Sequence, residues 1–142
     1  MKLIIYPLKD NNLGIIEPNL ELTLEQAISN MPNDLPIGVV NSSEIYYSVI
    51  EAYKFQDKKA VVNISKAKEI WLNHYRAART PLLAALDLEY MRADEQDNLE
   101  LKKEIAAKKQ ALRDVTKTEL PDDLEGIKNT WPEILGSNPF NK

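Results

Sequence analysis

The sequence contains no cysteine and only one histidine, His74, among its 142 residues. A chain without cysteine cannot form a disulfide framework, a thiolate metal site or a cysteine nucleophile. A single histidine excludes histidine-rich metal clusters and argues against a histidine-based catalytic triad. The sequence therefore favours a protein without enzymatic activity, cofactor or bound metal.

An excess of positive charge and long apolar runs are also lacking. The formal net charge is −4 and the isoelectric point is near 5.1, so the basic surface of a nucleic-acid-binding protein is not expected. The apolar start, Lys2–Tyr6, ends at Pro7, whereas a secretory signal needs roughly 7–15 apolar residues. No stretch approaches the roughly 18 apolar residues of a membrane span. We expect no nucleic-acid or membrane partner, and a protein that stays in the compartment where it is made.

The charged residues divide the chain into three regions. Residues 1–64 carry 5 basic and 8 acidic side chains, residues 65–119 carry 11 and 10, and residues 120–142 carry 2 and 4. Dense charge of mixed sign is typical of solvent-exposed helices. The sequence predicts an α+β protein: a small N-terminal α+β module over 1–64, a long helical hairpin over 65–119, and an extended C-terminal tail over 120–142.

The N-terminal region has the pattern of an antiparallel β-meander. Lys2–Tyr6 and Leu13–Glu17 are apolar and flank Asp10-Asn11-Asn12, whose short polar side chains favour a tight turn, so a β-hairpin is predicted. Thr23 and Gln26 have the spacing of a capping box for a short helix over 24–31. Further strands are predicted at 38–40, 53–55 and 60–64, and a helical turn capped by Ser42 or Ser43 extends through Tyr47.

The middle region has the pattern of two helices. Apolar residues recur at spacings of 3 and 4 from Ala67 to Ala93, which indicates a helix that packs on another helix. Asn63 or Ser65 can cap its start. Pro81 removes one backbone donor and should kink this helix near 77–80, unless Thr80 and Pro81 begin a second helix. After a polar connection, Asp97 or Asn98 can cap a helix over Leu99–Val115, which completes an αα-hairpin.

Each apolar stripe of this hairpin is narrow, so we expect the N-terminal module or a second copy of the chain to complete it. In the C-terminal region, residues 122–128 could form a short helix. Trp131 should anchor the tail, either on its own chain or on a partner, because a tryptophan buries a large area. The predicted partner-binding residues are Trp71, Tyr75, Leu82, Leu86, Tyr90 and Trp131.

Three groups of polar residues are candidates for chemical sites. His74 could be a general base, but a structural or surface role fits it better. The carboxylates between Asp87 and Glu104 lack the spacing and central glycine of a calcium-binding loop, and turn and cap chemistry explains them better. The two lysine pairs of residues 102–103 and 108–109 alternate with glutamates, as on a solvated helix face. The sequence predicts no catalytic, cofactor or metal site.

Several blocks of the sequence resemble a family of small bacteriophage proteins encoded near tail and tail-fibre genes. The N-terminal blocks are Met1–Tyr6 and Thr23–Ala27, and the longer blocks are Ala67–Ile70, Arg76–Asp87, Tyr90–Ala93, Lys109–Val115 and Ile127–Pro132. Gln110–Asp114 followed by Trp131-Pro132 also resembles the C-terminal segment of phage tail-fibre assembly chaperones.

This resemblance implies a phage protein that is made in the bacterial cytosol, acts in tail or fibre morphogenesis and then resides in the virion. Its partners would be phage tail or tail-fibre proteins, in a homo-oligomer or another symmetric complex. The helical hairpin is longer and more charged than in the chaperones. That departure favours a minor virion subunit at the tail tip, collar or fibre attachment, with an assembly chaperone as the alternative.

Overall fold

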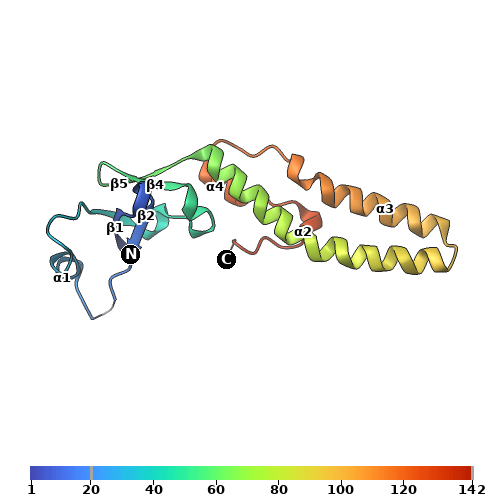
Figure 1. The fold of residues 1–142 in the computed structure, drawn as a ribbon, viewed down its shortest axis with the longest axis horizontal. Coiled ribbons are helices and arrows are strands. Elements are labelled where there is room, and N and C mark those ends of the chain that lie inside the picture. The colour runs from blue at the N-terminus through green and yellow to red at the C-terminus, as the bar shows by residue number, and fades with distance from the viewer. Residues whose placement is uncertain (20, 142) are drawn as a thin grey trace. The chain divides into compact units, whose positions relative to one another are not determined.

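The computed structural model describes residues 1–19 and 21–141 and contains two compact units, Met1–Ala67 and Lys68–Lys142. The first unit holds two small antiparallel sheets, and the second is built on a pair of long helices that pack together (Figure 1). The α+β class is therefore confirmed. The boundary between the units lies close to the predicted one after residue 64.

The first sheet has the strand order β2-β1-β3. It consists of β1 (Lys2–Pro7), β2 (Leu13–Ile16) and β3 (Gly38–Asn41), and both pairings of β1 are antiparallel. Asp10 and Asn11 between β1 and β2 have φ of 59° and 58°, a left-handed conformation that Asp and Asn tolerate better than most residues. The predicted first hairpin and its turn chemistry are confirmed.

The second sheet consists of β4 (Tyr53–Gln56) and β5 (Lys59–Val62). Asp57 and Lys58 connect these strands, and both have positive φ (51° and 61°), which matches the twist of a two-residue hairpin turn. The strands thus form two sheets rather than one meander. Outside the named strands, an isolated β-bridge between Asn12 and Lys54 links the second hairpin to the first.

Two glycines allow close approaches within the first unit. Gly14 lies opposite Tyr6 in the sheet, and a Cβ added there would lie 2.5 Å from the tyrosine ring. At Gly38 an added Cβ would lie 2.0 Å from the carbonyl oxygen of Lys58. Any side chain at Gly38 would therefore push the β4–β5 turn away from β3.

Short helices of the first unit follow local capping rules. Helix α1 (Leu24–Ser29) begins with the predicted capping box, in which Thr23 and Gln26 each accept a backbone N–H bond from the other. The turn at Ser42–Glu44 is a 3₁₀ helix that starts after Asn41 without a side-chain cap, so the predicted serine cap is wrong. A second 3₁₀ segment, Tyr47–Ala52, leads into β4.

Helix α2 (Ile64–Glu95) runs without interruption through Pro81. Asn63 caps its start by accepting the Lys66 N–H bond. The alternative in which Thr80 and Pro81 begin a new helix is wrong, because one missing donor does not end so long a helix. The Thr80 hydroxyl donates to the Arg76 carbonyl, a contact that favours helix bending. Figure 1 shows α2 changing direction in its yellow-green stretch, as expected at a proline.

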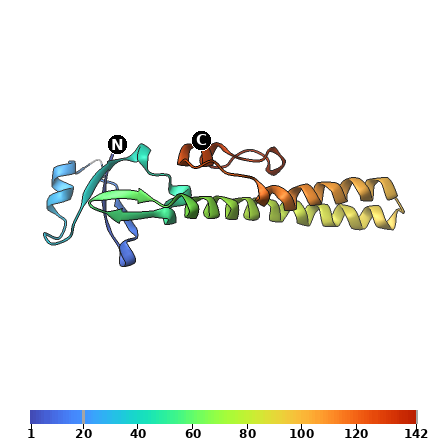
Figure 2. The ribbon, with the colours of Figure 1, turned by 90° about the horizontal axis from the view of Figure 1, so that it is seen from above.

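The remaining elements complete the second unit. Helix α3 (Leu99–Asp114) is capped by Asn98, and both views show it running back alongside the second half of α2 (Figures 1 and 2). A 3₁₀ turn (Val115–Lys117) follows it. Helix α4 (Leu124–Asn129), capped by Asp123, corresponds to the helix predicted at 122–128, and a 3₁₀ turn at Glu133–Leu135 comes after it.

Candidate functional site

Residues 118–141, which we call the C-terminal segment, follow the turn after α3. An aromatic cluster joins this segment to the first half of α2. The ring centroid of Trp131 lies 5.9 Å from that of Trp71 and 5.2 Å from that of Tyr75, and both pairs meet edge to face. Phe140 packs 5.2 Å from Trp71 and 4.5 Å from the single histidine, His74. The edge-to-face geometry of the two Trp131 pairs is one that aromatic rings prefer, and the two Phe140 pairs are tilted. The C-terminal segment is thus anchored on its own chain.

Hydrogen bonds fix the segment in register. The Thr130 carbonyl oxygen accepts a bond from Trp71 Nε1 at 2.9 Å and a second bond from the Tyr75 hydroxyl. The Asn138 side-chain amide donates to the Lys128 carbonyl at 2.9 Å, which ties the chain end to α4. Because burial disfavours the phenolate, the pKa of Tyr75 is raised. The aromatic cluster is therefore a packed, hydrogen-bonded core.

The interface between α2 and α3 combines a narrow apolar strip with charged edges. Ala93 on α2 and Ile105 and Leu112 on α3 are almost fully buried. Lys102 pairs with Asp94, and Lys109 pairs with Asp87. The bond to Asp94 raises the pKa of the Lys102 ammonium.

Tyr90 lies between these ion pairs. The ammonium groups of Lys102 and Lys109 each lie 5.6 Å from the centroid of its ring, within cation–π range. Nearer the open end of the hairpin, Arg79 donates to the Arg113 carbonyl at 2.8 Å. Polar bonds at both ends therefore set the register of α3 on α2.

The predicted partner-binding residues occupy different positions in this unit. Trp71 and Tyr75 have no exposed surface and contact the C-terminal segment. Leu86, Tyr90 and Trp131 are half-buried within the second unit. Leu82 has 36% of its surface exposed. The structure therefore brings Trp71, Tyr75 and Trp131 together as core, and leaves Leu82 the most accessible of the set.

Sequence reasoning missed two features of this unit. Phe140 belongs to the aromatic cluster. The residues next to it in the sequence do not indicate that it packs against Trp71 and His74 on α2. Leu88 and Met91 are 50% and 60% exposed on α2. Ala77, Pro81 and Ala84 precede these two residues at spacings of 3 and 4. The sequence therefore contains the pattern of a second apolar stripe on α2.

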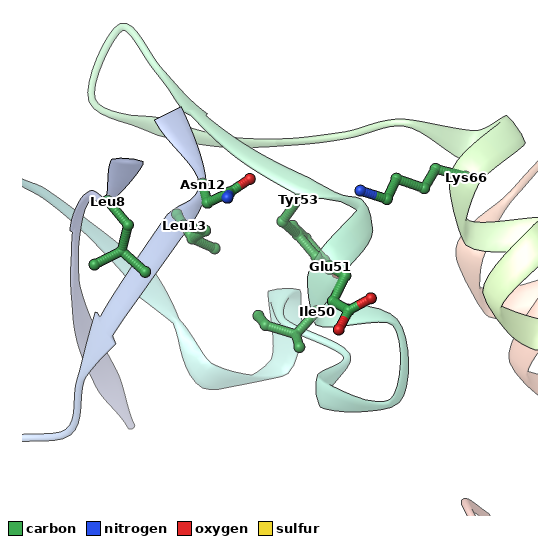
Figure 3. Close-up of a pocket in the computed structure, with 7 residues that line it drawn as sticks. All are labelled: Leu8, Asn12, Leu13, Ile50, Glu51, Tyr53 and Lys66. Carbon is green, nitrogen blue, oxygen red and sulfur yellow. The ribbon is translucent and has the colours of Figure 1, made fainter. Parts of the chain in front are cut away.

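The first unit contains a small open cavity of about 320 Å³. Figure 3 shows the ammonium of Lys66 and the carboxylate of Glu51 beside apolar side chains of the lining. The hydroxyl of Tyr53 is already engaged, since it donates to the Glu44 carbonyl and accepts the Tyr46 N–H bond. One cation and one carboxylate at an open surface do not form an acid–base or nucleophilic pair.

Within residues 1–19 and 21–141, no three His, Asp or Glu side chains lie close enough together to hold a metal ion. None of the helices described has both the length and the apolar character to cross a bilayer. No family model, curated protein or solved structure matches the chain.

Proposed function

We propose that this chain is a bacteriophage tail-associated protein that acts by binding other proteins. In the favoured form it is a minor virion subunit at the tail tip, collar or fibre attachment, made in the bacterial cytosol and then carried in the virion. The support from the sequence is the resemblance of the blocks in α2, α3 and the C-terminal segment to small phage proteins. This assignment gives the chain no catalytic step.

The structural observation that carries the proposal is the exposed apolar surface of the helical hairpin. The C-terminal segment covers the aromatic side chains of the first half of α2, whereas large apolar side chains remain exposed farther along the hairpin. They are Leu82, Leu88, Met91, Leu99 and Leu101, with between 36% and 61% of their surface exposed. Covering such surface contributes about 25 cal/mol per Å², and the flanking charges would set the register of a partner.

An assembly chaperone is the second candidate. Gln110–Asp114 and Trp131-Pro132 resemble the C-terminal segment of tail-fibre chaperones, and the structure places the first block at the end of α3 and the second in the aromatic cluster. A chaperone would use the same exposed apolar surface to cover a fibre protein until assembly. It would then leave, so the two candidates differ in whether the mature particle retains the chain.

Quantitative mass spectrometry of purified phage particles and of the lysate from the same infected cells tests both candidates. A subunit is expected in the particle at a small copy number that matches threefold or sixfold tail symmetry. The major capsid protein supplies the normalisation. Abundance in the lysate with absence from particles would assign the chaperone role instead. Absence from both samples would contradict the proposal.

A further inference from the structure

A second apolar stripe follows the face of α2 that points away from α3. It consists of Ala77, Pro81, Ala84, Leu88 and Met91, all of them exposed. With 3.6 residues per turn, these five positions lie within about 80° of the helix circumference, and Tyr90 and Ala93 lie on the opposite side. We call these five residues the outer stripe.

The other helix of the hairpin has no such surface. On α3 the face opposite the buried Ile105 and Leu112 presents Lys103, Ala107 and Gln110, which are exposed and mainly polar. A helix with apolar residues on two opposite faces is typical of an element with neighbours on both sides. Within the second unit, α3 and the C-terminal segment cover one face of α2, and the outer stripe is left exposed.

The order of large and small residues along the stripe fits a second copy of itself. The first three positions, Ala77, Pro81 and Ala84, are small or compact, and the last two, Leu88 and Met91, are large. In an antiparallel pair centred near Ala84, Met91 meets Ala77 of the other copy and Leu88 meets its Pro81. Large side chains then fill the space above small ones, as close packing requires.

The charges beside the stripe favour the same arrangement. Arg76 and Asp94 project from the same flank of α2, near opposite ends of the stripe, and both are exposed. The Asp94 side chain keeps 63% of its surface exposed while paired with Lys102. Two antiparallel copies bring Arg76 of each chain opposite Asp94 of the other. In a parallel pair the two-fold axis runs along the helices and places this flank of the two copies on opposite sides of the interface, so Arg76 and Asp94 would not meet each other.

We propose that the outer stripe is the interface of an antiparallel homodimer with its two-fold axis close to Ala84. The occupant is a second copy because the stripe and its flanking charges are complementary to their own reversed order, as an isologous contact requires. The stripe spans about 21 Å of helix, which is short for a stable interface, so association should depend on concentration. This inference concerns the purified chain and does not rest on the phage assignment, for which Leu82, Leu99 and Leu101 remain exposed outside the stripe.

The absence of cysteine permits a direct geometric test. Ala84→Cys should form a disulfide-linked dimer on mild oxidation, because a disulfide requires Cα atoms about 4.4–6.8 Å apart. Met91→Cys alone should not, whereas a mixture of Met91→Cys and Ala77→Cys should form the mixed dimer. Ala107→Cys, on the outer face of α3, is the matched control. Ala84→Cys dimers no more abundant than those of the control, or efficient Met91→Cys dimers, would overturn the antiparallel interface.

Sedimentation velocity gives an independent readout. The mass of the native chain should rise from 16.2 kDa towards twice that value as its concentration increases. The double substitution L88D/M91D should keep the chain monomeric and weaken association at least tenfold. A107D/Q110D adds the same two charges to the outer face of α3 and should leave association unchanged. A native chain that stays monomeric at all concentrations, or equal effects of the two double variants, would overturn the proposal.

Discussion

Trp131 shows how one side chain can position a whole chain segment. Its ring meets those of Trp71, Tyr75 and Phe140 edge to face or nearly so, and each such pair contributes about 0.5–1.5 kcal/mol beyond the buried area. Its indole N–H is buried and has no hydrogen-bond partner among the described groups. The contribution of this residue therefore comes from packing, partly offset by an unsatisfied donor.

Trp131→Ala should lower the free energy of unfolding by about 2–3 kcal/mol, somewhat less than for a fully buried tryptophan. Trp131→Phe should cost only about 1 kcal/mol, because it keeps a ring and removes the unpaired N–H. Ile134→Ala, at a position that is 41% exposed in the same segment, is the control. Urea unfolding followed by circular dichroism measures all three. Equal losses for Trp131→Ala and Ile134→Ala would contradict the anchoring role.

The hydroxyl of Tyr75 makes the stability of the second unit depend on alkaline pH. Burial raises the folded-state pKa of this hydroxyl above the ordinary tyrosine value of 10.0, so the neutral form favours the folded state. The stabilisation is complete below pH 10 and is lost as the pH rises through the folded-state pKa. In urea titrations at a series of pH values, Tyr75→Phe should therefore lose less stability than the native chain once the pH rises above about 10. A variant with an unchanged pH slope would argue against this assignment.

At the scale of elements, local chemistry accounts for most of what the sequence predicts. The first hairpin follows from an Asx turn between apolar segments, and α1 follows from Thr23 and Gln26. The helical hairpin follows from the 3–4 spacing and from Asn98 as a cap. Each of these signals acts over a few residues, so it can be recognised without knowing the tertiary contacts.

The features that the sequence does not predict depend on interactions between residues that are far apart in the chain. The effect of Pro81 could not be decided from the sequence, because the cost of one lost hydrogen bond must be compared with the packing of the rest of α2. The separation into two sheets depends on how β4 meets the first hairpin. The position of Phe140 depends on contacts with α2, far away in the sequence. Among the candidate site residues, the helical pattern correctly indicates that Trp71 and Tyr75 share a face, but it does not specify the segment that covers them.

Pro81 gives a prediction at this scale. Pro81→Ala supplies the missing backbone donor to α2 and should raise the free energy of unfolding by about 1–3 kcal/mol. Thermal and urea unfolding followed by circular dichroism measure this change. Pro139→Ala, outside any helix, should produce no comparable gain. A loss of stability in Pro81→Ala would show instead that the bend of α2 is needed for its packing on α3 and the C-terminal segment.

At the scale of the whole molecule, the chain is divided into two units with separate cores. The core of the first unit is built on the strands, with Leu3, Ile4 and Phe55 among its buried residues. The core of the second unit includes Trp71, Tyr75, Ile105, Leu112 and Ile127. Because each unit buries its own apolar residues, each meets the first requirement for independent folding.

A fragment of residues 63–142, which retains the Asn63 cap of α2, should fold alone. We expect a helical circular dichroism spectrum and a cooperative thermal transition. A fragment of residues 63–118 should melt at a lower temperature, because it lacks the segment that covers Trp71 and Tyr75. If the longer fragment showed no cooperative transition, the second unit would need the first in order to fold. Equal melting temperatures for the two fragments would contradict a stabilising role for the C-terminal segment.

The aromatic cluster also determines the intrinsic fluorescence of the protein. Both tryptophans of the chain, Trp71 and Trp131, belong to this cluster, whereas four of the six tyrosines lie in the first unit. Excitation at the red edge of the near-ultraviolet absorption band excites tryptophan rather than tyrosine. The emission therefore reports on the aromatic cluster alone. Release of the C-terminal segment would hydrate both indoles at once and shift their emission to longer wavelength. The native chain thus carries an intrinsic fluorescent reporter of that single docking event.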